Sequence, residues 1–168
     1  GEHLRREGLM LRRTKAEVLP ELPEKRRLVQ QIDADDMVYR RLMQPVLEKL
    51  RLLRADGDML PSARALLMDQ ISLEERQATG IAKAPFVCQF VRALLENGER
   101  VLLFAHHHAV MDIYRQELHA FSPAFITGRE SGAQKEEAAA RFMQGQTNLC
   151  CVSLRAASGL NLQRASCV

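Results

Sequence analysis

The runs VLLF (101–104) and LCCV (149–152) decide the fold of this chain, because both are continuous in apolar residues and both lead into polar or glycine-bearing residues. A continuous apolar run of this length is typical of a strand that is covered on both faces, as in a parallel sheet. In open α/β sheets, ligands bind at the carboxyl ends of the strands. We therefore expect functional residues directly after these runs, at 106–108 and 153–162.

Helical patterns alternate with the strand-like runs over the second half of the chain. The apolar spacing predicts helices over 83–97, 109–121 and 134–143, and a third strand over 124–126. Helices of about 10–15 residues between strands imply βαβ crossovers. The predicted fold class is α/β, with a parallel sheet and helices on both of its faces. The final apolar pair, Cys167-Val168, reads as the start of another strand, so we expect either a fragment or further residues beyond it.

The first 80 residues are predicted to be mainly helical. Asp33 and Asp35 are good N-cap candidates for a helix over 37–53, where apolar residues recur at intervals of three and four. A second helix is expected from 61 to about 78, with a proline in its first turn and Gly80 as its end. A helical segment therefore precedes the predicted sheet.

A basic segment opens the chain and ends in LPELP (19–23). Proline disfavours helix at the residue before it and cannot donate to a strand ladder, so this opening segment reads as ending in a linker. Residues 27–34 then alternate apolar and polar side chains loosely enough for an edge strand.

Length and composition describe one domain with an aliphatic core. The 168 residues are 46% hydrophobic and 5% aromatic, with no Trp, so aromatic base-stacking platforms are not expected. Lys and Arg are concentrated in the first 54 residues, although the net charge is only +3. That concentration fits phosphates or an acidic partner surface, and it fits a solvated helix face equally well.

The four cysteines show neither zinc-site spacing nor the framework of a secreted scaffold. Two of them, Cys150 and Cys151, lie in a predicted buried strand, where they read as small apolar residues in a reducing compartment. The chain has no signal peptide and no apolar run near the ~20 residues that a membrane span needs. We expect an intracellular protein without membrane contact, in the cytoplasm of a prokaryote or the nucleus of a eukaryote.

Three motifs resemble those of one family, in the same order along the chain. LMLRRTK (9–15) with VLPELPEK (18–25) resembles the block that joins the two RecA-like lobes of Swi/Snf-type DNA-dependent ATPases, in helicase superfamily two. VLLFAHH (101–107) is similar to motif IV of that family, in the variant of its annealing-helicase branch. SLRAASGLNL (153–162) is similar to its motif V.

The resemblance implies a RecA-like lobe and a domain organisation. It gives an interlobe connector over 1–26, an edge strand plus helical segment over 27–80, and a C-terminal RecA-like lobe over 81–168. The arginine-finger motif that should follow the strand begun at Cys167 is missing, as are a G-x-x-x-x-G-K-[ST] phosphate loop and an Asp-Glu-x-His box. This chain alone is therefore expected to be inactive, because the positioning and charge-stabilising parts of phosphoryl transfer are absent.

By the same resemblance, the full-length protein is an ATP hydrolase that translocates on double-stranded DNA. This chain is expected to be its second lobe, which grips DNA phosphates and closes on ATP and Mg²⁺ held mainly by the first lobe. No cofactor is expected in this chain by itself. The expected partners are double-stranded DNA and the N-terminal RecA-like lobe of the same protein.

The resemblance also implies two sets of site residues in this lobe, with no catalytic residue and no metal ligand. The residues expected to face ATP or the other lobe are Arg155, Ser158, Gly159 and Leu160. The residues expected to face DNA phosphates are His106, His107, Thr127, Gly128, Lys135 and Ser153.

Both sets have plainer readings, and both depart from the family's pattern. Gly159 could be an ordinary turn glycine, and Ser153 could cap its own backbone at the strand end. Thr127 stands where the family has Asp. Lys135 stands where it has Arg, and a lysine ammonium offers a point charge in place of a rigid fork. Motif V is also one residue shorter than usual, which puts its geometry toward the nucleotide in doubt.

Two other functions stay open. One is a non-catalytic module that binds nucleic acid or protein on a RecA-like scaffold. The other is an unrelated α/β enzyme that uses the histidines, with or without a metal. His106 and His108 could converge from an extended segment, but no acidic or thiolate ligand lies at a supporting spacing.

Overall fold

The structure is a computed structural model that describes residues 3, 6–8, 26–55, 57 and 59–168. The chain forms two compact units, residues 1–31 and 32–168, and the sheet lies in the second. The connector predicted over 1–26 lies largely outside the described residues. Residues 26–35 form neither strand nor helix, in place of the edge strand predicted there.

Three parallel strands make the sheet, as predicted. They are β1 (Val101–Ala105), β2 (Ala124–Ile126) and β3 (Leu149–Ser153), in the order β1-β3-β2. The register pairs the first and last residues of β1 with those of β3, so the two carboxyl ends are level. Cys167 bridges Val101 in parallel on the other side of β1, and its carbonyl accepts from a β1 amide at 2.9 Å. The pair predicted to start another strand therefore makes an isolated bridge beside β1.

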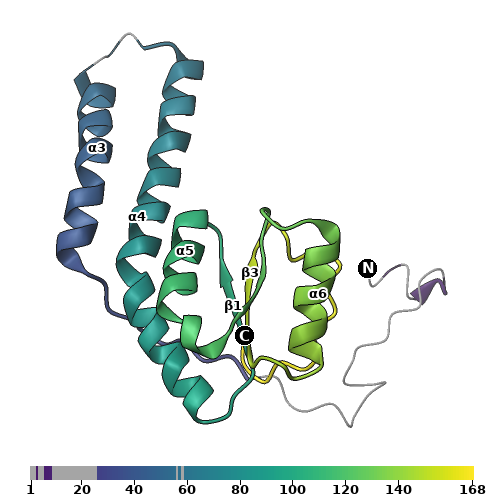
Figure 1. Cartoon of the computed structure of the whole chain (residues 1–168). Helices are drawn as coiled ribbons and strands as arrows, with labels where there is room; N and C mark the ends of the chain where they lie inside the picture. Colours follow the sequence, from purple (N-terminus) through teal and green to yellow (C-terminus); the bar gives the residue numbers. More distant parts are fainter. Residues whose placement is uncertain (1–2, 4–5, 9–25, 56, 58) are drawn as a thin grey trace. The chain divides into compact units, whose positions relative to one another are not determined.

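Helices cover both faces of the sheet (Figure 1). One face carries α5 (His108–Glu117), followed by a short 3-10 helix, and the C-terminal half of α4 (Pro61–Glu96). The other face carries α6 (Gly132–Met143), which starts at a capping box between Ser131 and Gln134. These helices confirm the predicted α/β class with a layer on each face.

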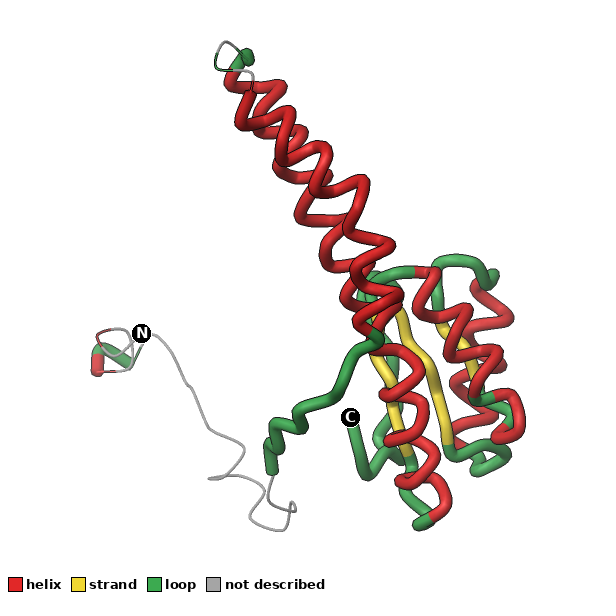
Figure 2. Tube along the Cα trace, turned by 90° about the vertical axis from the view of Figure 1, so that its left-hand side faces the viewer, coloured by secondary structure: helices red, strands yellow, loops and turns green. Residues whose placement is uncertain are grey.

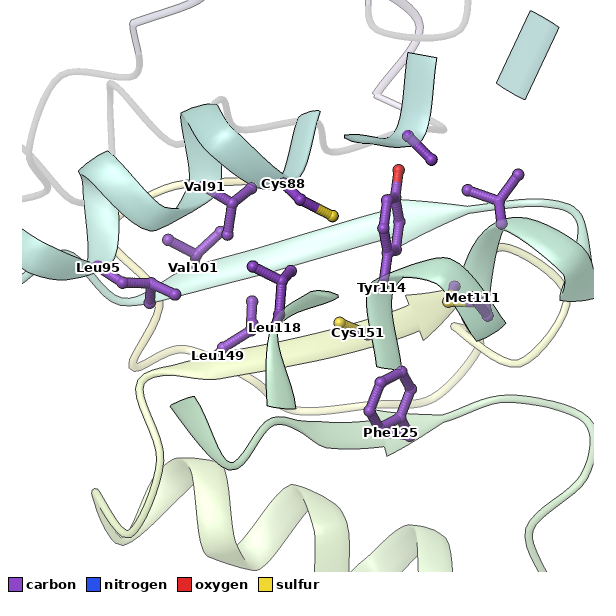
Figure 3. Packing of buried hydrophobic residues seen from close by; sticks show 12 residues of the cluster. Cys88, Val91, Leu95, Val101, Met111, Tyr114, Leu118, Phe125, Leu149 and Cys151 are labelled. Atoms are coloured by element: carbon purple, nitrogen blue, oxygen red, sulfur yellow. The ribbon is translucent and has the colours of Figure 1, made fainter. Parts of the chain in front are cut away.

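The core has one apolar cluster on each side of the sheet. Cys88, Leu118 and Cys151 belong to the cluster under α4 and α5 (Figure 3). Burial raises the pKa of Cys88 to about 11 and that of Cys150, on the opposite face, to about 12. These thiols stay protonated at neutral pH and pack as apolar side chains.

The helix α4 is continuous over 36 residues, so the prediction of two helices separated at Gly80 is wrong. Gly80 lies at the contact between α4 and α5. A Cβ built on Gly80 would lie 3.0 Å from Cγ2 of Val110 in α5, so the absence of a side chain lets the two helices approach closely. The helix ends where predicted, at Asn97-Gly98, with Gly98 at a φ of 81°.

A helical hairpin precedes this packed part of α4. The first arm is α3 (Asp36–Ala55), whose N-terminus is capped by Asp35, since a carboxylate oxygen of Asp35 accepts from the Val38 amide at 2.9 Å. The arms bury Val46, Leu53 and Ile71 between them, and Lys49 pairs with Glu74 across the hairpin. Figure 2 shows the hairpin projecting beyond the sheet.

The close approach at Gly80 gives a graded stability prediction. Gly80→Ala is expected to change the free energy of unfolding by less than about 1 kcal/mol, because better helix propensity offsets a small displacement of Val110. Gly80→Leu is expected to cost about 1–3 kcal/mol through overpacking against α5. Urea denaturation of the two variants measures both values. Equal stability of Gly80→Leu and the wild type would contradict the close α4–α5 contact.

Candidate functional site

The carboxyl ends of the three strands meet around one cavity of about 210 Å³, the edge cavity. Its lining comes from the segments after β1 and β2, the end of β3 and the turn that follows it, the start of α5 and one side chain of α4. The lining residues are Leu73, His106, His107, His108, Gly128, Ser153 and Arg155. Four residues predicted to face DNA phosphates therefore lie together with the arginine predicted to face ATP or the other lobe.

The turn after β3 places Arg155 at this edge. The Leu154 amide donates to the Ala105 carbonyl at 3.1 Å, and the Ala156 amide donates to the Ser153 carbonyl at 2.9 Å. These two bonds close a tight turn that keeps Ser153 buried and leaves Arg155 exposed. The guanidinium is therefore available to a ligand at the edge, while the backbone beneath it is held.

The loop after β2 is organised by Glu130. The Glu130 carboxylate accepts from the Thr127 amide at 2.6 Å and from the Thr127 hydroxyl at 2.7 Å. Thr127 is only 1% exposed, and its hydroxyl also accepts from the Arg129 amide at 3.1 Å. The predicted phosphate contact of Thr127 stays a prediction, and the hydroxyl's own bonds favour the exposed backbone of Gly128 as the point of contact.

Two ion pairs attach the same loop to α5. Arg129 donates to both carboxylate oxygens of Asp112, at 2.5 and 3.1 Å, and Arg115 lies 3.7 Å from Glu130. The hydrogen bonds from Arg129 lower the pKa of Asp112. Burial works to raise the pKa of Glu130, but the hydrogen bonds from Thr127 outweigh it and lower that pKa. Both carboxylates are thus ionised, and they hold the loop in one conformation.

Sequence reasoning missed Glu130 as a positioning residue. The only local signal is that Glu130 follows Thr127 by three residues, a spacing at which a carboxylate can accept a hydrogen bond from a backbone amide at the strand end. The partners on α5 are 15 or more positions away in sequence and leave no local pattern. Glu130 supports the edge without lining it.

His107 has a shifted pKa at this edge. Burial lowers its pKa, and the positive charges of His106, Arg155 and Arg76 lower it further. The rings of His106 and His107 meet edge to face, with centroids 4.8 Å apart. The edge therefore gathers cationic and neutral donors without a carboxylate in its lining, which suits an anionic group.

The perturbation of His107 gives a prediction about pH. Because its folded pKa lies below the ordinary 6.5, the neutral ring contributes stability that is complete above pH 6.5 and is lost as pH falls through the folded value. Arg155→Ala is expected to raise the His107 pKa only part of the way back to its ordinary value, since burial, the larger cause, remains. Imidazole NMR titration measures this. Arg51→Ala, on the exposed side of α3, is the control, and an unchanged His107 pKa in Arg155→Ala would contradict the proximity.

Five of the predicted residues, Thr127 among them, lie outside the lining of the edge cavity. Ser158 is exposed beside Gly159, which has a φ of 77° and nothing within 4 Å of an added Cβ. Leu160 packs against the core cluster under α6. Lys135 is half-buried in the first turn of α6. None of these residues lines the edge cavity with Arg155.

The segment after motif V is anchored by Arg164, which sequence reasoning also missed. Its guanidinium donates to the carbonyls of Phe142 and Thr147, both at 3.1 Å, and to the Asn148 side chain at 2.9 Å. These bonds join the segment to the end of α6 and to the residues before β3. They hold the chain that returns toward β1.

Within the part of the chain that the structure describes, no group of three or more His, Cys, Asp or Glu side chains is placed to hold a metal ion. Among the same residues, no helix has the length and apolar character that a membrane span requires.

Comparisons with known proteins agree with this geometry. Residues 82–168 match the family model of the helicase conserved C-terminal domain. The chain is 36% identical over 117 residues to a SWI/SNF-related matrix-associated actin-dependent regulator of chromatin subfamily A-like protein 1 homolog of Caenorhabditis elegans, covering 66% of this chain and 15% of that protein. It is 28% identical over 163 residues to the SWI/SNF-related matrix-associated actin-dependent regulator of chromatin subfamily A-like protein 1 of Drosophila melanogaster. That match covers 95% of this chain and 21% of the Drosophila protein.

A solved structure shares the fold. The Sulfolobus solfataricus SWI2/SNF2 ATPase C-terminal domain superposes with a TM-score of 0.61 at 14% identity, over 75% of this chain and 64% of that one. The chain spans about a fifth or less of the length of the two curated relatives above. It belongs to the helicase conserved C-terminal domain family, with sequence similarity to SWI/SNF-related proteins and the fold of a SWI2/SNF2 ATPase C-terminal domain.

Proposed function

We propose that this lobe acts with a first RecA-like lobe of the same protein as an ATP-dependent translocase on double-stranded DNA. The observation that carries the proposal is the edge cavity, where Arg155 and the histidines meet Ser153 and the exposed Gly128 backbone. No carboxylate lines that cavity. Its donors and positive charge suit phosphate oxygens, which provide most of the sequence-independent affinity for DNA.

The residues divide between two ligands in this proposal. His106, His107, Ser153 and the Gly128 backbone grip the phosphates of one DNA strand. Lys135 and Thr127 support that grip from α6 and from the loop after β2. The separation of Lys135 from the edge cavity fits contact with a neighbouring phosphate.

The nucleotide side is formed by Arg155 and the turn at Ser158-Gly159, next to Leu160. Gly159 has a positive φ and an open approach, so its backbone can come close to an anionic group or to the other lobe. An exposed guanidinium beside exposed backbone fits the phosphates of ATP. ATP with Mg²⁺, held mainly by the first lobe, supplies the phosphoryl transfer. Arg155 contributes positive charge, and the packed core beneath Leu160 holds the turn in place.

In the full-length protein, residues 1–26 connect the two lobes and the hydrolysis cycle opens and closes the cleft between them. Alternating grips on backbone phosphates convert that closure into steps along the duplex. The relatives are named as regulators of chromatin, which supports an intracellular site of action and, in a eukaryote, the nucleus.

The test is ATP hydrolysis by the full-length protein with duplex DNA, with single-stranded DNA and without DNA. We expect turnover to depend on duplex DNA and the 168-residue chain alone to be inactive, since it has no phosphate loop. Affinity for DNA is expected to fall steeply with salt. Binding of duplex DNA without DNA-dependent turnover would support the rival, a non-catalytic binding module on a RecA-like scaffold.

A further inference from the structure

A second and larger cavity, of about 470 Å³, lies between α4, the end of β1 and the start of α5. We call it the α4 cavity. Its lining includes Leu73, Val87, Phe104, Val110, Tyr114 and Leu154, so most of its wall is apolar. It shares Leu73, His106 and His107 with the edge cavity and extends away from Ser153 and Arg155 along α4. The translocase proposal gives this space no role.

The shape of the α4 cavity follows from a seven-residue repeat in α4. Leu66, Leu73, Gly80 and Val87 recur every seven residues, which is about two helical turns, so they lie along one side of the helix. The last three line the cavity, and Gly80 leaves a depression between its larger neighbours. Leu66 and Leu73 are 66% and 49% exposed, so the apolar stripe continues out of the cavity for about 10 Å. An extended partner fits this surface better than a compact molecule does.

Positive charge runs beside the stripe. Arg76 and Lys83 follow Leu73 and Gly80 by three residues each, so they flank the stripe on the adjacent side of α4. Both are exposed, both line the cavity, and neither is in a salt bridge among the described residues. No carboxylate lines the α4 cavity. A ligand that places a carboxylate beside Arg76 or Lys83 therefore gains charge complementarity at the rim.

The inner wall also offers a hydrogen-bond donor. Tyr114 is 5% exposed, and its hydroxyl is directed away from Cys151, out of the cluster of labelled side chains (Figure 3). Burial raises the pKa of Tyr114, so the hydroxyl keeps its proton. Phosphate groups are poorly suited to this wall, because they would lose hydration against Val87 and Phe104. A large apolar side chain that enters the cavity gains free energy, because its apolar surface leaves water.

We propose that the α4 cavity binds a protein segment in which a large apolar side chain is flanked by carboxylates. The apolar side chain fills the space between Val87, Phe104 and Tyr114, and the carboxylates pair with Arg76 and Lys83. The partner is thus an acidic peptide with an apolar anchor, and the α4 cavity is a recruitment site next to the DNA-binding edge. This assignment does not depend on ATP hydrolysis.

The test uses the isotope-labelled 168-residue chain and a capped ten-residue peptide, with Phe-Leu at its centre and Glu at the other positions. We expect NMR shifts at Leu73, Val87 and Tyr114, and a higher His107 pKa as carboxylates approach. A peptide with Lys in place of Glu, and one with Ser-Ser in place of Phe-Leu, are expected to bind at least tenfold more weakly.

Variants assign the binding to the cavity. Lys83→Glu and Leu73→Ser are each expected to weaken binding of the acidic peptide at least tenfold. Both positions are exposed, so the fold is retained. Arg51→Glu and Leu52→Ser, on exposed positions of α3, are the matched controls and should bind as the wild type does. Absence of shifts at millimolar peptide, or equal binding of the Lys-flanked peptide, would overturn the proposal.

A duplex oligonucleotide separates this proposal from the translocase proposal. If the duplex displaces the peptide and shifts Val87 and Tyr114 itself, the α4 cavity belongs to the DNA site and the peptide proposal fails. If the peptide binds while full-length ATPase activity proves independent of DNA, the translocase proposal fails and the peptide site stands. Lys83 lies outside the edge cavity, so its variant tests the peptide site without touching the proposed phosphate grip.

Discussion

Replacing Arg155 by alanine in the full-length protein is expected to lower DNA-stimulated ATP turnover by about 100-fold or more. Loss of one preorganised group that stabilises developing charge typically costs about 10²–10³ in kcat. The turn at Ser153 holds the backbone of Arg155 at the carboxyl edge, and the side chain lines the edge cavity. Steady-state hydrolysis at saturating duplex DNA and ATP measures the effect on kcat.

The matched controls for this variant are Arg155→Lys and Arg51→Ala. Lysine retains the charge without the planar fork, so Arg155→Lys is expected to recover only part of the activity. Arg51→Ala, on α3, should behave as the wild type. Arg155 is exposed, so the alanine variant should unfold at the wild-type urea concentration. Full activity in Arg155→Ala would mean that the nucleotide side of the lobe lies elsewhere.

Replacing Phe142 by alanine is expected to destabilise the lobe by about 3–5 kcal/mol. Phe142 is fully buried on α6 and packs with Ile126 and Val152 on the second face of the sheet. The Arg164 guanidinium also lies 5.7 Å from the centre of its ring, so the variant removes a cation–π contact. Domains of this size are commonly stable by only about 5–15 kcal/mol, so the variant loses a large share of that stability.

Phe90→Ala is the control for this experiment, because Phe90 on α4 is 42% exposed. Its cost is expected to be clearly smaller than that of Phe142→Ala, since Phe90 buries less apolar area and lies outside the packed clusters of the sheet. Chemical denaturation of both variants, followed by far-UV circular dichroism, gives the two free energies. A cost for Phe142→Ala no larger than that for Phe90→Ala would contradict the packing of α6 on the sheet.

Much of the fold was accessible from local patterns. Continuous apolar runs predicted β1 and β3, and the intervening helical spacing predicted a parallel sheet, because backbone periodicity imposes a matching pattern on buried side chains. The stop at Asn97-Gly98 and the cap at Asp35 were also readable, since each depends on neighbours within four residues. The apolar pair Cys167-Val168 likewise indicated pairing with the sheet, and Cys167 makes an isolated bridge to Val101.

Gly80 shows where local patterns stop. Its sequence context resembles a helix end, yet α4 continues through it. The glycine lies there because Val110 of α5 packs against the position that a side chain would occupy. The edge strand expected over 27–34 fails for a related reason. Loose alternation does not specify a partner, and in the 32–168 unit the outer side of β1 is bridged by Cys167. A strand requires a neighbour, which alternation alone does not provide.

The candidate site divides in the same way. Position after a strand predicted that His106, Ser153 and Arg155 would lie at one edge, because parallel strands bring their carboxyl ends together, and the edge cavity contains all three. Gly128, which the family resemblance indicated, lies with them. Tertiary structure alone decided that Glu130 would organise the loop after β2. Its anchors on α5, and the α4 cavity next to the edge, depend on contacts between residues far apart in sequence, which no local period encodes.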